Sequence, residues 1–228
     1  MTRPKTQSDE QVLEAALRLI HEHGPEALTF ERLAKACGLS GATLVQRFGN
    51  KARLKQRTLL HAWDGLDDKT RTLAAAVPRT PAGAVELLVA LSQGYGGIES
   101  YAEGLLVLRE DLRDPMLRTR GAAWKTTLCN ALAPCFAGTP GSPQDIGLLM
   151  ASHWQGSLLW WSFDPTIEVA VYVEDSLNPF RCRHHDGSGP KTMMVLGPLD
   201  EAEMRAYSAC FGPRSNTTMA ASSVAMPQ

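Results

Sequence analysis

The sequence has no long uninterrupted hydrophobic run. Among its 228 residues, no stretch approaches the roughly 18–20 apolar residues that a membrane-spanning helix requires. The first ten residues, MTRPKTQSDE, also lack the apolar centre of a secretory signal. We therefore expect a cytoplasmic protein without a membrane partner.

Cysteine is scarce and irregularly placed. The five cysteines are Cys37, Cys129, Cys135, Cys182 and Cys210, and no two of them form a C-x-x-C pair. An odd and scattered set argues against a disulfide framework and against a structural zinc site. We expect a protein with no metal and no cofactor.

The motifs that identify common enzyme classes are absent as well. The sequence contains no G-x-S-x-G elbow, no P-loop, no dinucleotide-binding glycine fingerprint and no H-E-x-x-H zinc motif. Cys129 and His153 are one conceivable thiol–imidazole pair, but nothing in the sequence positions them. The run Cys182, His184 and His185 has metal-ligand chemistry but lacks further ligands. We therefore expect that the protein is not an enzyme.

Net charge is nearly absent overall, but it is unevenly distributed. The formal charge is −1. Residues 1–60 contain ten Lys or Arg and six Asp or Glu, a balance of +4, whereas residues 61–228 contain thirteen against eighteen, a balance of −5. A basic N-terminal region on an acidic body favours a polyanionic partner for that region. A solvated surface without a partner is the alternative interpretation.

Capping and breaking residues divide the N-terminal third into helices. Ser8, Ser40 and Asn50 are good N-caps, and Gly24 and Gly38 end the helices that precede them. Apolar residues recur at helical spacing between these signals. The four predicted helices cover about residues 9–24, 29–38, 40–48 and 50–76.

The remainder of the chain also has helical periodicity as far as about Arg181. The segment 165–180 is rich in β-branched residues, but Pro165 suits the first position of a helix and the apolar spacing favours a helix. Residues 182–228 are rich in Gly, Ser, Pro and Thr, which predicts a largely disordered tail with one short helix around residues 200–211. The other predicted helices cover about residues 81–95, 102–112, 116–136 and 144–163.

The second and third helices form a helix-turn-helix pattern over residues 29–48. A short turn containing Gly38 joins them, and Ala34 is small where the two helices must approach closely. Leu33 and Leu44 are apolar where both helices rest on the first helix. The pattern predicts a DNA-binding unit, with a helical hairpin bearing a solvated basic face as the alternative.

The third helix has the side chains that reading DNA requires. Small and hydroxyl side chains at its start allow a close approach to the major groove, and Thr, Gln and Arg can bond base edges or phosphates. Lys51 begins the fourth helix, where backbone N–H groups also attract phosphate. The predicted DNA contacts are Thr29, Ser40, Gly41, Ala42, Thr43, Gln46, Arg47 and Lys51.

The stretch LTFERLAKACGLSGATLVQRFGNKARL resembles the N-terminal domain of the TetR/AcrR family of transcriptional regulators. The family pattern is approximately T-x-x-x-I-A-x-x-A-G-V-S-x-G-T-L-Y-x-H-F-x-S-K-x-x-L, and the resemblance covers about residues 8–65. Val45 stands where the family usually has a phosphate-binding Tyr, and Arg47 stands where it usually has His or Tyr. The positions in register are Thr29, Leu33, Ala34, Gly38, Leu39, Ser40, Thr43, Leu44, Phe48, Asn50, Lys51 and Leu54.

The resemblance implies an all-α fold with three parts. A three-helix helix-turn-helix DNA-binding domain at residues 5–65 would precede a helical domain at 66–181 that binds a small effector and dimerises through its last two long helices. A tail would follow at 182–228. An aromatic-lined cavity in the helical domain is one interpretation of its tryptophans, and plain core packing is the other. The candidate effector-pocket residues are Tyr95, Trp124, Met150, His153 and Trp154.

Two further interpretations concern the long apolar helix 144–163. His153 could be a metal-binding or catalytic side chain, but a lone histidine on an apolar helix is more often a hydrogen-bonded core residue. Trp160 and Trp161, together with Val171, are candidates for the dimer interface, where exposed tryptophans act as anchors.

The resemblance therefore predicts a ligand-responsive transcriptional regulator, with a repressor favoured. A homodimer would bind a pseudo-palindromic double-stranded DNA operator, and a small apolar or aromatic effector would release it. The alternative is a helical ligand-binding or protein-interaction module that has no specific affinity for DNA.

Overall fold

The computed structural model describes residues 7–181, and these residues form helices and loops without a β-strand. The all-α prediction is therefore confirmed for this part of the chain. Short 3-10 helices lie at Pro25–Ala27, Gln93–Tyr95 and Ala133–Phe136. The α-helices are α1 (Asp9–His23), α2 (Phe30–Cys37), α3 (Gly41–Phe48), α4 (Lys51–Ala76), α5 (Pro81–Ser92), α6 (Ile98–Arg113), α7 (Pro115–Leu132), α8 (Ile146–Trp161) and α9 (Val169–Arg181).

The predicted caps set the boundaries of the first four helices. Ser8 and Gln11 form a reciprocal capping box at the start of α1, with N–O distances of 3.2 and 3.0 Å. Ser40 and Asn50 accept the backbone N–H groups of Thr43 and Arg53. Because each cap satisfies a backbone donor that would otherwise lack a partner, local sequence alone fixes where these helices begin.

The last helix begins later than the sequence predicts. The expected start at Pro165 is wrong, because α9 begins at Val169. The buried indole Nε1 of Trp161 donates to the carbonyl oxygen of Ile167 at 2.8 Å, and the backbone N–H of Tyr172 bonds the carbonyl of Glu168. The loop between α8 and α9 is therefore tied to the end of α8 instead of continuing α9.

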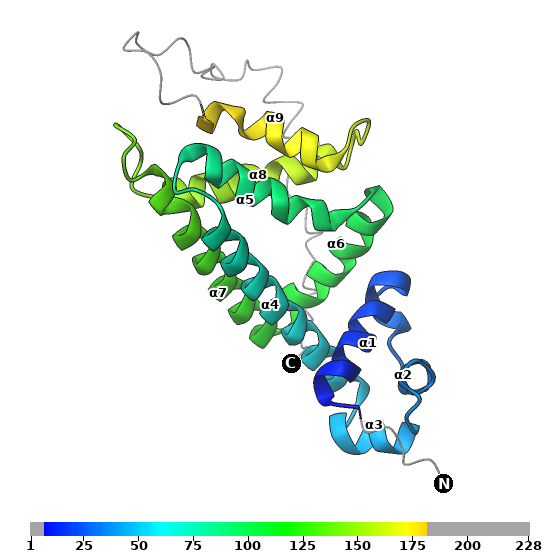
Figure 1. The fold of residues 1–228 in the computed structure, drawn as a ribbon. Coiled ribbons are helices and arrows are strands. Elements are labelled where there is room, and N and C mark those ends of the chain that lie inside the picture. The colour runs from blue at the N-terminus through cyan, green and yellow to red at the C-terminus, as the bar shows by residue number, and fades with distance from the viewer. Residues whose placement is uncertain (1–6, 182–228) are drawn as a thin grey trace, which may run out of the picture. The chain divides into compact units, whose positions relative to one another are not determined.

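Two hydrophobic clusters organise the helices. One gathers buried side chains of α1–α4, including Phe48, and the other gathers buried side chains of α5, α7, α8 and α9. Trp63 on α4 packs against both clusters, and α4 runs alongside α7 as it leaves the first one (Figure 1). The predicted boundary near residue 65 remains a prediction, and the predicted tail at 182–228 lies outside the described residues.

The helices do not meet the requirements of a membrane span. Across residues 7–181, none combines the length and the apolar character needed to cross a bilayer.

Candidate nucleic-acid interface

The third helix is held by its buried face, which leaves its other face free. Leu44 and Phe48 are completely buried in the N-terminal cluster. Val45 and Gln46 lie on the exposed side of α3. The turn before α3 is fixed by Gly38, which adopts a left-handed conformation with φ +65°. The helix therefore presents its polar face outward in one defined orientation.

Hydroxyl groups line the beginning of α3. The Oγ of Ser40 accepts the backbone N–H of Thr43 at 3.1 Å, and the two side-chain oxygens lie 2.8 Å apart. Gly41 and Thr43 are half-buried, and Ala42 is exposed beside them. The structure thus brings these predicted residues together at one helix end that has no bulky side chain.

Arg47, which the sequence predicts as a DNA contact, is half-buried and bonded to the start of α1. Its Nε donates to Asp9 Oδ1 at 2.7 Å, and a second nitrogen donates to the carbonyl of Gln7 at 2.9 Å. Arg57 donates to the other oxygen of Asp9 at 3.0 Å. In this arrangement Arg47 joins α3 to the start of α1.

The charge of Asp9 responds to these two arginines. Burial opposes the ionised form, but the hydrogen bonds and positive charges of Arg47 and Arg57 outweigh it and lower the pKa of Asp9 below its ordinary value of 3.8. The resulting cluster stabilises the packing of α3 and α4 against α1. Sequence reasoning missed it because Asp9 and Arg47 are 38 residues apart.

Lysines at the start of α4 are also paired. Lys51 Nζ lies 3.2 Å from both the carbonyl oxygen and the carboxylate of Glu26. Lys55 lies 3.9 Å from Glu26 and 2.5 Å from Glu110 on α6. Glu26 therefore engages Lys51, the predicted phosphate contact, and also approaches Lys55, which is paired with α6. Arg53, exposed on the same turn, is a further candidate contact that the sequence reasoning missed.

The predicted effector-pocket residues occupy different environments. Trp124 and Trp154 are buried with ring centroids 6.4 Å apart, and Met150 is buried with them in the C-terminal cluster. Tyr95 is only partly buried and packs against the same cluster, edge-on to Tyr101, and burial raises its pKa to about 12. The first three therefore share a packed core.

His153 is not a core residue. It is exposed on α8, and its Nε2 lies 2.8 Å from the carbonyl oxygen of Ser176 on α9. Its ring contacts that of Phe180 edge-on, with centroids 5.4 Å apart. His153 thus joins α8 to α9, away from Trp124 and Trp154 in the core.

The dimer candidates divide between surface and core. Trp160 is 68% exposed and Val171 is 50% exposed, whereas Trp161 is only 3% exposed and packs edge-on against Tyr101. Trp161 is therefore a core residue, and its predicted place at the surface is wrong. Phe163, which is 73% exposed and in ring contact with Trp160, extends the apolar surface that the sequence analysis identified only in part.

Metal-binding geometry is not found within residues 7–181. No group of three or more His, Cys, Asp or Glu side chains there is arranged to hold a metal ion. The Cys182, His184 and His185 run lies outside the described residues.

The comparisons with known proteins point to one family. Residues 12–57 match the family model described as bacterial regulatory proteins, tetR family. No curated protein matches the chain at the sequence level. The matched segment contains α2, α3 and the capped start of α4, which are the elements that build the interface described above.

Solved structures of similar fold cover three quarters of the chain. PfmR, a TetR family transcriptional regulator from Thermus thermophilus, has a TM-score of 0.54 and 20% identity over 75% of this chain and 97% of its own. A transcriptional regulator from Rhodococcus sp. Rha1 has a TM-score of 0.58 and 20% identity over 76% of this chain and 94% of its own. A protein from Saccharomonospora viridis is described as a transcriptional regulator and was solved in complex with choline. It has a TM-score of 0.60 and 18% identity over 75% of this chain and 93% of its own. At these identities the likeness concerns the fold.

Proposed function

The chain carries a TetR-family DNA-binding domain within a TetR-like helical fold, and from this premise we propose that it is a dimeric, ligand-responsive repressor of transcription. The observation that carries the proposal is the presentation of α3. Its apolar face is buried, its start is capped by Ser40, and its outer face offers Gln46 and the half-buried Thr43. A helix held in this way fits the major groove of DNA.

The proposed DNA contacts fall into two groups, contacts to base edges and contacts to phosphates. Thr43, Gln46 and the small residues Gly41 and Ala42 would approach base edges, where an amide can pair with adenine. Thr29 and Ser40 would bond phosphates, and Lys51 would add a charge at the start of α4. Arg47 acts in this proposal as a positioning residue, because Asp9 already engages its guanidinium.

A second copy of the chain would complete the DNA-binding unit. Exposed apolar side chains lie on α8, on the loop after it and on α9, namely Trp160, Phe163 and Val171, and Trp160 contacts Phe163. Burial of such aromatic side chains drives association. Two α3 helices could then reach successive major grooves, whose centres are roughly 34–36 Å apart. The operator would accordingly be a pseudo-palindrome in chromosomal DNA, and binding to it would require the protein to be in the cytoplasm.

Effector binding would act through the helical body. The bound choline in one protein of similar fold supports a small-molecule site in such a bundle. Here the core near Trp124 and Trp154 is the candidate place for an apolar or aromatic effector. The pairs Lys55–Glu110 and Gln56–Asp114, the latter at 2.7 Å, join α4 to α6 and to the residue that caps α7. Movement of α6 would therefore displace α4, and linkage requires DNA to weaken effector binding reciprocally.

Selection from a random pool of duplex DNA tests the proposal. The purified chain should enrich a sequence with two symmetric half-sites, and fluorescence anisotropy should show preference for that sequence over scrambled DNA. Replacement of both Thr43 and Gln46 by Ala should remove the preference, whereas replacement of the exposed Gln155 on α8 should leave it unchanged. If no sequence is enriched and duplexes fail to bind even at low salt, the chain is a helical interaction module instead.

A further inference from the structure

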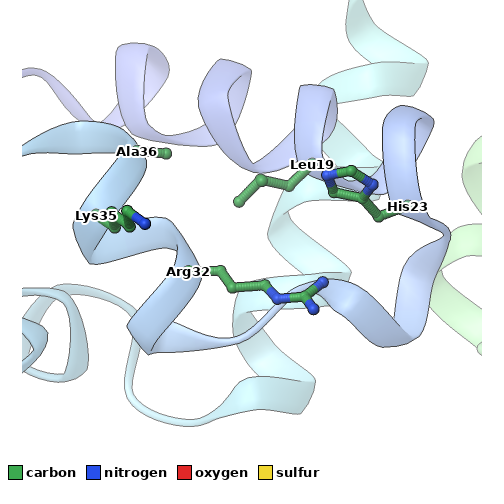
Figure 2. A pocket seen from close by; sticks show the side chains of 5 residues that line it. All are labelled: Leu19, His23, Arg32, Lys35 and Ala36. Carbon is green, nitrogen blue, oxygen red and sulfur yellow. The ribbon is translucent and has the colours of Figure 1, made fainter.

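An open pocket lies between α1 and α2, beside the interface described above. Figure 2 shows the side chains that line it, Leu19 and His23 on α1 and Arg32, Lys35 and Ala36 on α2. The volume of the pocket is about 780 Å³, which exceeds what a single small ion requires. None of the predicted DNA-contact residues lines it, and the proposed function assigns it no role.

The polar groups of this pocket are all nitrogen-bearing. His23, Arg32 and Lys35 supply its polar side chains, and no Asp or Glu lines it. Within residues 7–181, Arg32 and Lys35 make neither an ion pair nor a side-chain hydrogen bond. Arg47 and Lys51 of the same domain, by contrast, are paired with Asp9 and Glu26. The charges of Arg32 and Lys35 are therefore available to an external anion, whereas His23 Nε2 lies 3.8 Å from the carboxylate of Glu22.

The basic side chains continue a row that starts at the proposed DNA face. Thr29, Arg32 and Lys35 follow one another at intervals of three residues, so they lie along one side of α2. Thr29 Oγ1 accepts the backbone N–H of Arg32 at 3.2 Å, so Thr29 is the N-cap of α2 and Arg32 lies in its first turn. An anion that contacts Thr29 can thus continue along α2 into the pocket.

We infer that this pocket is a phosphate-binding site that receives the sugar–phosphate backbone of DNA flanking the major-groove contacts. The inference rests on the proposed DNA-binding function. Arg32 and Lys35 would contact phosphate oxygens, with the guanidinium able to bind two at once. Leu19 and Ala36 offer apolar surface to the deoxyribose between phosphates. A free polyphosphate shares the phosphate chemistry but not the sugar, so the two sources can be separated.

The test is the salt dependence of binding by a double variant, Arg32→Gln with Lys35→Gln. Anisotropy titrations over a range of KCl would use the selected operator in a form with long flanks and in a form trimmed to its core. With long flanks, the slope of log K against log[KCl] should fall by about 1.8 per subunit, because each lost phosphate contact contributes about 0.9. On the trimmed duplex, the variant and the unmodified chain should have the same slope.

A matched variant controls for the loss of charge. Arg109→Gln with Lys125→Gln removes two exposed positive charges from α6 and α7, far along the chain from the pocket. It should leave the slope on the long duplex unchanged. Because Arg32 and Lys35 are themselves exposed, their variant should unfold at the temperature of the unmodified chain, which circular dichroism would verify.

The outcomes separate the two proposals. An unmodified chain that binds no duplex overturns the proposed function and this inference together. An unmodified chain that binds DNA, with an equal slope for the double variant on the long duplex, overturns only the inference. Calorimetric titration with inorganic pyrophosphate tests the free anion as the ligand. If pyrophosphate binds the unmodified chain but not the Arg32 and Lys35 double variant, and the salt slope for DNA is the same in both, the pocket binds a free anion and not the DNA backbone.

Discussion

At the scale of single residues, Asp9 is the centre of the helix-turn-helix packing. Its two carboxylate oxygens bond Arg47 and Arg57, so one side chain of α1 holds both α3 and α4. The orientation of α3 therefore depends on a residue that would not touch DNA. Loss of Asp9 should reduce both stability and DNA binding.

Replacement of Asp9 by Asn should lower the free energy of unfolding at pH 7 by roughly 1 kcal/mol, since the cluster is partly exposed to solvent. The folded-state pKa of Asp9 lies below the ordinary value of 3.8, so its stabilisation is present above that value and is lost as pH falls through the folded pKa. Urea titrations at pH 7 and pH 3.5 should therefore show a difference that shrinks at the lower pH. A constant difference would contradict this account.

Glu26 should act as a competitor of DNA. Its carboxylate occupies Lys51 and approaches Lys55, so Glu26→Gln should free Lys51 for phosphate and raise affinity for all duplexes several-fold at low salt. Anisotropy with operator and scrambled DNA measures this. The matched control is Glu168→Gln, which removes an exposed negative charge next to α9. Equal gains from both variants would show that only net charge matters.

At the scale of elements, α6 contains a buried carboxyl group that opposes stability near neutral pH. Asp111 is 7% exposed, and its Oδ1 has no hydrogen-bond partner among residues 7–181. Burial raises its pKa to about 6, and the neighbouring Asp114 and Glu110 add to the rise, while a hydrogen bond from Trp63 lowers it. The ionised form is therefore less stable in the folded chain than in the unfolded chain.

Asp111→Asn should consequently stabilise the protein above pH 6. Because the folded pKa lies above the unfolded value, the unmodified chain loses stability as pH rises from about 4 through about 6. At pH 7.5 the variant should be more stable by roughly 3 kcal/mol, because the pKa rises from 3.8 to about 6 and each pKa unit corresponds to 1.36 kcal/mol, and near pH 4 most of the gain should vanish. Guanidinium titrations at both pH values test this, with the exposed Asp164→Asn as a control that should change neither.

The elements show what the sequence could and could not predict. Helices α1–α4 were predictable within a few residues because Ser8, Ser40 and Asn50 act on their own backbone neighbours. The pairing of Arg47 with Asp9 was not, because it depends on how α1 packs across α3. From the sequence, Trp160 and Trp161 are equally plausible interface residues, but Trp160 is exposed and Trp161 is buried. Consecutive residues on a helix point about 100° apart, and only the packed positions of neighbouring helices decide which is buried.

At the scale of the whole molecule, the proposed activity requires two copies. Trp160→Glu with Phe163→Glu should convert the dimer to a monomer, because burial of two carboxylates in an apolar interface is unfavourable. Sedimentation velocity should detect the change, and affinity for the full pseudo-palindrome should fall by more than about tenfold while binding to one half-site persists. Leu112→Glu, at a 60% exposed position on α6, is the control. If the double variant stays dimeric, the interface lies elsewhere.

Two buried indoles give the molecule built-in optical reporters. Trp154 Nε1 donates to Ser92 Oγ at 2.8 Å, and Trp124 Nε1 donates to Thr70 Oγ1 at 3.0 Å. Each hydroxyl also donates to a carbonyl of its own helix, those of Leu88 and Leu66. A guest that entered this core would have to displace an indole from its acceptor and change its fluorescence. Screening of compounds by emission spectrum therefore needs neither a label nor knowledge of the target gene.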